Sequence, residues 1–99
     1  MSTPLTGAVL IGRIRIKHAK KWTAYRDAVP ATLTPFDATL VARGNDARVL
    51  AGTTDETDVV VIRFPSLEAI EDWYASAAYQ ALIPLREEAG DVAIVGYRL

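Results

Sequence analysis

The sequence predicts one small α+β domain, in which a four-stranded antiparallel sheet carries its helices on one face. Three observations support this fold class. The chain has 99 residues, enough for one domain but not for two. Its apolar residues recur with a period of two in some segments and of about 3.6 in others. The segment Val59-Val60-Val61-Ile62 is β-branched throughout, as in a strand covered on both sides at the centre of a sheet.

Composition sets aside several classes of protein. Hydrophobic residues make up 51% of the chain and charged residues 23%, which is typical of a globular protein. Eleven Lys and Arg against twelve Asp and Glu give a net charge of -1, so we expect no nucleic-acid partner and no binding to a membrane surface. The chain has no cysteine, which excludes disulfides, thiolate metal sites and thiol nucleophiles.

No targeting or membrane-spanning segment is evident. Residues 1–7 lack the basic start and apolar centre of a signal peptide. No apolar stretch approaches the roughly 20 residues that cross a bilayer. We therefore expect a soluble, cytoplasmic protein with an N-terminal tail at residues 1–7 and a single domain at residues 8–99.

Periodicity places four strands and two helical regions along the chain. The strands are expected at residues 8–17, 38–44, 58–64 and 92–99, with a short hairpin continuation at residues 48–51. The helical regions are expected at residues 18–33 and 66–88, and residues 52–57 are expected to be a polar loop. The resulting order, β-α-β-β-α-β, is that of the ferredoxin-like split βαβ fold.

Local signals mark the ends of the helices. Ser66 and Ser76 are each suited to cap the start of a helical segment. Pro30 should kink or end the first helix because it removes a backbone hydrogen bond, and Pro84 should interrupt the last one. Apolar side chains recur at helical spacing on both regions, at Trp22, Tyr25, Val29, Leu67, Ile70, Trp73 and Tyr74.

The sheet predicts a partner, because helices on one side cover only one of its faces. The other face would expose Val9, Ile11, Val59 and Val61, together with alternate residues of the last strand. Soluble monomers rarely leave so large an apolar patch open. The loop at residues 52–57 is too short and too polar to cover it. We therefore predict a homodimer, in which a two-fold partner lays its own sheet against this one.

Several segments resemble a known family. They are Phe64-Pro65-Ser66-Leu67-Glu68-Ala69, Trp73-Tyr74-Ala75-Ser76-Ala77-Ala78-Tyr79-Gln80, Pro84-Leu85-Arg86, Tyr25, Pro30-Ala31-Thr32-Leu33, Val41-Ala42-Arg43-Gly44 and Val49-Leu50-Ala51-Gly52. Over nearly the whole chain they resemble the bacterial family known as domain of unknown function 1330. The resemblance implies a dimeric α/β barrel formed by two ferredoxin-like protomers, and it implies no particular reaction. This chain has Asp37-Ala38 where the family usually has a glycine pair, and Asn45 where it usually has a second glycine.

His18 stands at the junction of the first strand and the first helix. Histidine titrates near neutral pH, so His18 could act as a general base or as a single axial ligand. The simpler interpretation is an exposed basic stretch shared with Lys20 and Lys21. The resemblance also implies a wider superfamily that includes haem-degrading enzymes. Haem degradation by their route would need a helix histidine facing a large pocket, and a histidine at a strand end is poorly placed for that.

Four aromatic residues with polar tips, Tyr25, Trp73, Tyr74 and Tyr79, are the next candidates. On helices that face a sheet, such side chains most often form the core. Their hydroxyl and indole groups nevertheless need hydrogen-bond partners. A pocket between helices and sheet, lined by some of these residues, would allow water or a ligand to fill that need.

Arg43 and Arg86 lie in the segments that resemble the family, and either guanidinium could clamp a carboxylate. Arg86 could instead pair with a surface carboxylate or cap helix carbonyls. Strand arginines on the face assigned to the dimer, Arg13, Arg15 and Arg63, are suited to ion pairs at its rim. The cluster Asp55-Glu56-Asp58 lacks the ligand order of a calcium loop, and no other metal motif is present.

These features lead to one functional hypothesis and one alternative. The hypothesis is a homodimeric α/β-barrel protein that binds or transforms a small organic acid or aromatic compound without a cofactor or a metal. Arg43 or Arg86 would anchor the anion, a tyrosine would donate a hydrogen bond, and His18 would transfer a proton. Trp73, Tyr74 and Tyr79 would line the site, with Tyr25 as a further catalytic candidate. The alternative is a non-catalytic binding or assembly module.

Overall fold

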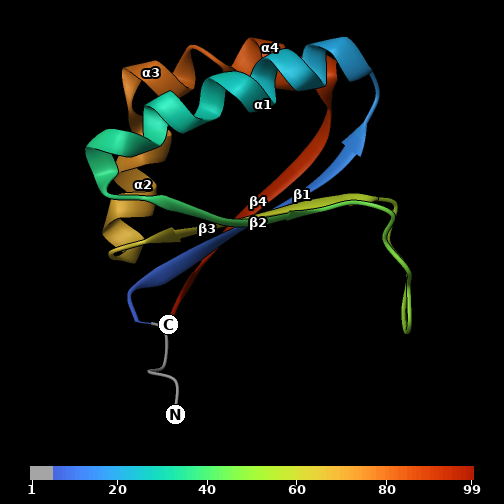
Figure 1. Ribbon diagram of the computed structural model, residues 1–99, viewed down its shortest axis with the longest axis horizontal. Coiled ribbons are helices and arrows are strands. Elements are labelled where there is room, and N and C mark those ends of the chain that lie inside the picture. Colours follow the sequence, from blue (N-terminus) through green and yellow to red (C-terminus); the bar gives the residue numbers. More distant parts are fainter. Residues whose placement is uncertain (1–5) are drawn as a thin grey trace.

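The computed structural model describes residues 6–99, so residues 1–5 of the expected tail lie outside the described part. Four antiparallel strands form one sheet in the order β2-β3-β1-β4. They are β1 (Ala8–Ile16), β2 (Thr39–Gly44), β3 (Asp58–Phe64) and β4 (Gly90–Arg98). The helices lie together on one face of the sheet, as Figure 1 shows. They are α1 (Ala19–Leu33), the 3-10 helix η1 (Thr34–Phe36), α2 (Leu67–Ala75), α3 (Ala77–Gln80) and α4 (Ile83–Ala89).

The expected caps begin the helices. The hydroxyl of Ser66 accepts a hydrogen bond from the Ala69 amide at 3.1 Å at the start of α2. The hydroxyl of Ser76 accepts one from the Tyr79 amide at 3.3 Å at the start of α3. Each bond satisfies an amide that has no partner inside its helix. The second helical region is therefore divided at Ser76, as predicted, and divided again between α3 and α4.

The helix α1 ends at Leu33, as predicted, and of the two effects expected from Pro30 the structure excludes an early end at this residue. The structure corrects two other local predictions. Residues 48–51 form no strand and belong to the long β2–β3 connection, which extends away from the helices (Figure 1). The last strand begins at Gly90 rather than at residue 92. Glycine is needed at this position because a Cβ on residue 90 would collide with the backbone oxygen of Arg15.

Asp37, which replaces the first glycine of the family's usual pair, has a left-handed backbone with φ 53°. It follows η1 and turns the chain into β2. Glycine reaches this region without steric cost, and aspartate tolerates it better than most residues. The turn at this point is thus kept without the glycine.

The register assigns the two faces of the sheet as the sequence predicted. Leu10 pairs with Ile62 and Ala8 with Phe64, and all four side chains are buried beneath the helices. On the alternate face, Ile11 lies between Val61 and Val95. Residues of this outer face keep part of their surface exposed, and Val95 is 40% exposed. The apolar core of the protomer therefore lies on the helix side only.

An aromatic layer fills the space between the helices and one part of the sheet. Trp73 and Tyr79 are fully buried, with ring centroids 4.2 Å apart. Phe64 of β3 packs against Trp73, with ring centroids 5.7 Å apart.

Within residues 6–99, no helix is long and apolar enough to cross a membrane.

Candidate ligand cavity

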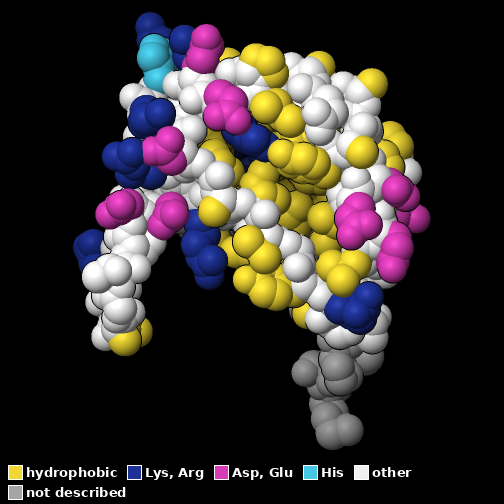
Figure 2. Space-filling model, turned by 180° about the vertical axis from the view of Figure 1, so that it is seen from behind, with side chains coloured by type: hydrophobic (Ala, Val, Ile, Leu, Met, Phe, Trp, Pro, Cys, Tyr) yellow, Lys and Arg dark blue, Asp and Glu magenta, His cyan; other side chains and the backbone are white. Residues whose placement is uncertain are grey.

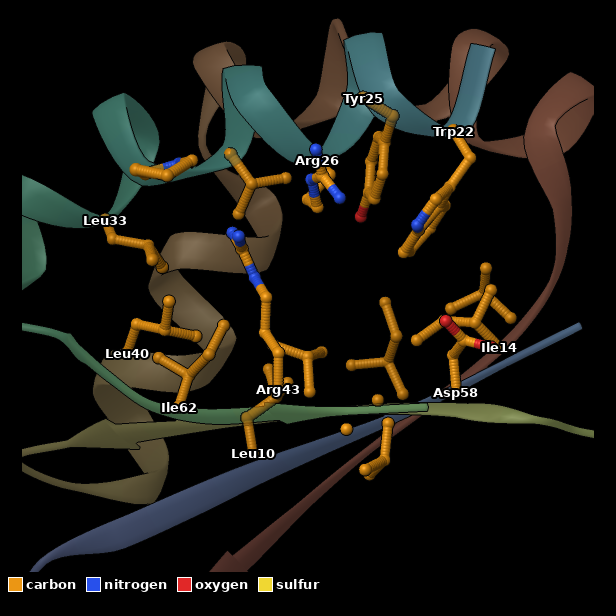
Figure 3. A pocket seen from close by; sticks show the side chains of 18 of the residues that line it. Leu10, Ile14, Trp22, Tyr25, Arg26, Leu33, Leu40, Arg43, Asp58 and Ile62 are labelled. Carbon is orange, nitrogen blue, oxygen red and sulfur yellow. The ribbon is translucent and has the colours of Figure 1, made fainter. Parts of the chain in front are cut away.

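A cavity of about 200 Å³ lies between α1 and the sheet. Its floor consists of apolar residues on the inner face, Leu10, Gly12, Ile14, Val60 and Ile62, and its roof of residues of α1, Trp22, Tyr25, Val29 and Leu33. Figure 3 shows the rings of Trp22 and Tyr25 reaching down from α1 toward the sheet. The β2 side adds polar residues at the wall. The cavity is thus apolar with a few charged groups, as small-molecule sites commonly are.

Two arginines contribute to this wall from different elements. Arg43 of β2 pairs with Val60, which places its side chain on the inner face, and Figure 3 shows its guanidinium rising toward α1. Arg26 lines the same cavity from α1. In the described part of the chain, Arg43 forms no ion pair, and Arg26 pairs only with its neighbour Asp27, at 3.4 Å. Two arginine side chains therefore line one largely apolar cavity, and neither forms an ion pair with another described residue of its lining.

Asp58 is the acidic group of the lining. It stands at the start of β3 opposite Ile14, and Figure 3 shows it on the side of the cavity near Ile14. One of its oxygens accepts a hydrogen bond from the hydroxyl of Thr57 at 2.7 Å. The lining thus carries cations from Arg26 and Arg43 and one separate anion.

A buried chain of polar groups connects this cavity to α4. The hydroxyls of Tyr25 and Tyr79 lie 2.8 Å apart. Arg86 Nη1 donates to the Tyr79 hydroxyl at 2.9 Å and to the Tyr74 hydroxyl at 3.4 Å. Burial and the neighbouring Tyr79 raise the pKa of Tyr25 well above its usual range. Tyr25 is therefore a neutral hydroxyl at physiological pH, which makes it a hydrogen-bond donor rather than a general base.

Arg86 is mostly buried, with its side chain 13% exposed. Burial opposes its charge, but the hydrogen bonds from Arg86 to Tyr74 and Tyr79 raise its pKa above the ordinary value. Its Nη2 pairs with Glu87 at 3.3 Å. Arg86 is therefore a permanently charged donor that holds the hydroxyls of Tyr74 and Tyr79 in place.

Trp73 has its own internal partner. Its indole Nε1 donates to the hydroxyl of Thr32 at 2.9 Å, and that hydroxyl donates to the Val29 carbonyl at 2.6 Å. Among the described residues, every buried side-chain nitrogen and oxygen has a partner. The polar tips of the aromatic layer are thus satisfied largely by one another and by Arg86 and Thr32, so their need for partners does not by itself require a ligand.

A second, more open hollow of about 380 Å³ lies between α2, α4 and β4. It is lined by Leu10, Ile70, Glu71, Trp73, Tyr74, Arg86, Val92, Ile94 and Gly96. Figure 2, which views the molecule from behind, shows the apolar side chains gathered around a hollow, with acidic side chains grouped beside it. Four residues line both hollows: Leu10, Trp73, Val92 and Ile94.

The structure divides the residues singled out from the sequence among three places. Tyr25, Arg43 and Trp73 line the cavity, and Tyr74 and Arg86 line the second hollow together with Trp73. Tyr79 lies between them as the fully buried link. His18 is apart from both: it is exposed and caps α1, where its Nδ1 accepts a hydrogen bond from the Lys21 amide at 3.3 Å. The described residues contain no cluster of three or more metal-ligating side chains.

Sequence reasoning did not single out three lining residues, Trp22, Arg26 and Asp58, as members of a site. A signal for Arg26 was present, because it follows Trp22 by four residues and therefore shares its helix face. Asp58 has the same strand parity as Val60 and Ile62, which marks it as an inward-facing carboxylate. The helix position of Arg26 and the strand parity of Asp58 become informative only when it is known which face of the sheet the helices cover.

The chain belongs to the family described as domain of unknown function 1330, whose profile matches residues 7–96. This confirms the resemblance found in the sequence. No curated protein matches the chain. The description of this family names no activity.

Solved structures share the fold at low sequence identity. A protein of unknown function from Rhodopseudomonas palustris has a TM-score of 0.76 and 16% identity, covering 96% of this chain and 84% of that one. SnoaB, a cofactor-independent oxygenase from Streptomyces nogalater, has a TM-score of 0.69 and 8% identity, covering 96% and 94%. A dimeric ferredoxin-like protein of unknown function from Thermobifida fusca has a TM-score of 0.64 and 16% identity, covering 95% and 92%. The ferredoxin-like α+β fold is thereby confirmed.

Proposed function

We propose that this protein is a homodimeric α/β-barrel protein that binds a small organic acid, preferably an aromatic one, in the cavity between α1 and the sheet. The observation that carries the proposal is the pair Arg26 and Arg43, two cations that line one largely apolar cavity and form no ion pair with Asp58, the acidic residue of its lining. A bound carboxylate would offset their charge and could accept a bidentate hydrogen bond from Arg43.

The size of the cavity limits the ligand. Sites for drug-sized compounds have volumes of about 300–1,000 Å³. A cavity of about 200 Å³ is suited to a compound of a single ring. The rings of Trp22 and Tyr25 supply flat apolar walls for such a ring.

A reaction in this cavity would use the protein's own groups rather than a bound cofactor. Tyr25 would donate a hydrogen bond to the ligand, and Arg43 would hold its carboxylate. Tyr79 and Arg86 would act behind Tyr25 rather than on the ligand itself. SnoaB, described as a cofactor-independent oxygenase, supports the idea that this fold can host chemistry of that kind.

The homodimer is part of the proposal. The outer sheet face presents Ile11 flanked by Val61 and Val95, with Tyr97 45% exposed nearby in β4. A second copy would cover this face by laying its own sheet against it. Proteins from Thermobifida fusca and Bacteroides fragilis that are described as dimeric and ferredoxin-like support the dimer.

The binding proposal is tested by titrating the protein with benzoate and with benzamide, its uncharged counterpart, while following thermal stability and heat of binding. Benzoate should stabilise the protein and benzamide should not. Arg43→Ala should weaken benzoate binding about tenfold or more, because a hydrogen bond to a charged group is lost. Arg48→Ala is the matched control, since Arg48 lies in the exposed β2–β3 connection. If the wild-type protein binds none of a panel of small carboxylates, the result would instead favour the non-catalytic assembly module.

A further inference from the structure

We infer that Arg86, Tyr79 and Tyr25 form a hydrogen-bond chain in which each group donates to the next and the last O–H, that of Tyr25, points into the cavity. The ligand that fits this donor is an aromatic acid that also carries a hydroxyl or enol oxygen. The inference rests on the proposed binding of a small acid and adds the second group that the ligand must carry. The order of donors and acceptors in the chain supplies the argument.

The direction of donation along the chain is set by Arg86. A guanidinium has only donors, so the Tyr79 oxygen accepts from Arg86 Nη1 at 2.9 Å. Tyr79 is 0% exposed, and the Tyr25 oxygen at 2.8 Å is the other partner of its hydroxyl among the described residues. If Tyr25 donated to Tyr79, the Tyr79 proton would be buried without an acceptor, which is costly. Tyr79 therefore donates to Tyr25.

The proton of Tyr25 is then free for another acceptor. Tyr25 lines the cavity, and Figure 3 shows its hydroxyl pointing down from α1 into that space. Its side chain is buried, and the described residues offer its hydroxyl no acceptor besides Tyr79. The chain thus ends in a donor that faces a cavity rather than a protein group.

The charge of Arg86 decides which acceptor binds best there. Each hydrogen bond in the chain polarises the next, so a positive charge at one end strengthens the donor at the other. An oxygen that carries negative charge, such as a phenolate or an enolate, gains most from this donor. The other cavity groups, Arg26 and Arg43, are also donors and would hold the carboxylate of the same molecule. An aromatic hydroxy acid carries both kinds of oxygen on one ring.

The test compares benzoate with 2-, 3- and 4-hydroxybenzoate, which differ only in the ring hydroxyl. Wild-type protein should bind at least one isomer about tenfold more tightly than benzoate. Tyr25→Phe should lose that preference, measured as the ratio of the hydroxybenzoate and benzoate affinities of the same variant. Tyr79→Phe should reduce the preference, because it cuts the chain one step earlier. Tyr74→Phe is the matched control: it also removes a hydroxyl from Arg86, but one that lies outside the chain to the cavity.

A spectroscopic readout separates donation from simple packing. The ultraviolet absorption of the preferred hydroxybenzoate reports ionisation of its phenol. On wild-type protein the bound phenol should ionise at a lower pH than in water, and on Tyr25→Phe this shift should shrink. Circular dichroism and melting curves identify any variant that fails to fold. In that case the pH at which the phenol ionises on the wild-type protein, compared with water, tests the inference by itself.

The outcomes distinguish the two proposals. Binding of benzoate with no preference for any hydroxybenzoate, or a preference that survives in Tyr25→Phe, overturns the directed chain and leaves the acid-binding cavity standing. Failure of all four compounds to bind to wild-type protein overturns the proposed function, and the inference with it.

Discussion

The indole Nε1 of Trp73 donates a 2.9 Å hydrogen bond to the hydroxyl of Thr32 and so joins α2 to α1 inside the core. Trp73 is 2% exposed and Thr32 is 7% exposed, so neither group can turn to solvent instead. The same tryptophan forms part of the wall of both hollows. This single contact therefore bears on the stability of the protein and on the shape of the site.

Thr32→Val should destabilise the protein by about 1–3 kcal/mol, because it leaves the buried indole N–H without a partner while keeping the volume of the side chain. Thr32→Ser should cost less, since it keeps the hydroxyl. Urea unfolding at fixed protein concentration, followed by tryptophan fluorescence, measures both. Thr23→Val is the control, because Thr23 is exposed on the same helix and its hydroxyl bonds only the Ala19 carbonyl. Equal stability of Thr32→Val and wild type would contradict the role given to this bond.

Ile11→Glu should convert the dimer to a monomer. Ile11 lies between Val61 and Val95 at the centre of the outer face, and a carboxylate buried there without a partner would cost several kcal/mol. Sedimentation velocity or light scattering at several concentrations should show a halved mass. Leu50→Glu changes a side chain that is 96% exposed in the β2–β3 connection, so it should leave the mass unchanged. A monomeric wild-type protein would refute the proposed dimer.

Asp91 should make stability depend on acid pH. A hydrogen bond from Arg15, another from Lys17 at 3.3 Å, and the charges of both hold the pKa of Asp91 below its ordinary value of 3.8. The carboxylate therefore contributes its full stabilisation above pH 3.8, and this is lost as pH falls through the lowered folded value. The Tm difference between wild type and Asp91→Asn should accordingly be largest near neutral pH and shrink in acid. A Tm difference that stays constant from neutral pH into acid would contradict this role of Asp91.

Most of the fold was predictable because its signals are local. Strand parity placed Leu10 and Ile62 on the helix side of the sheet, and the structure shows both buried there and paired with each other. Ser66 and Ser76 marked helix starts because a hydroxyl beside free amides works within a few residues. The first helix ends at Leu33 as predicted, with Pro30 inside it, because the loss of one backbone hydrogen bond does not end the helix there.

The candidate site was less predictable. Tyr25 and Arg43 were singled out from the sequence, and both line the cavity, but nothing local shows that Arg43 shares it with Arg26 and Asp58. His18 was singled out for its chemistry, yet it lies at the exposed start of α1, because capping needs a side-chain acceptor there. Arg86 was considered as an anion clamp, and its nearest groups are the hydroxyls of two tyrosines.

The sequence by itself determined the α+β class, the order of strands and helices, the buried parity of the sheet and the family. The class, the order and the parity follow from periodicity and caps, which act over a few residues, whereas the family follows from the resemblance of its motifs. Only the tertiary structure decided that Tyr25, Tyr79 and Arg86 form one chain, with Arg26 and Arg43 facing the same cavity. These groups come from α1, α3, α4 and β2, and their distances depend on how the helices pack on the sheet.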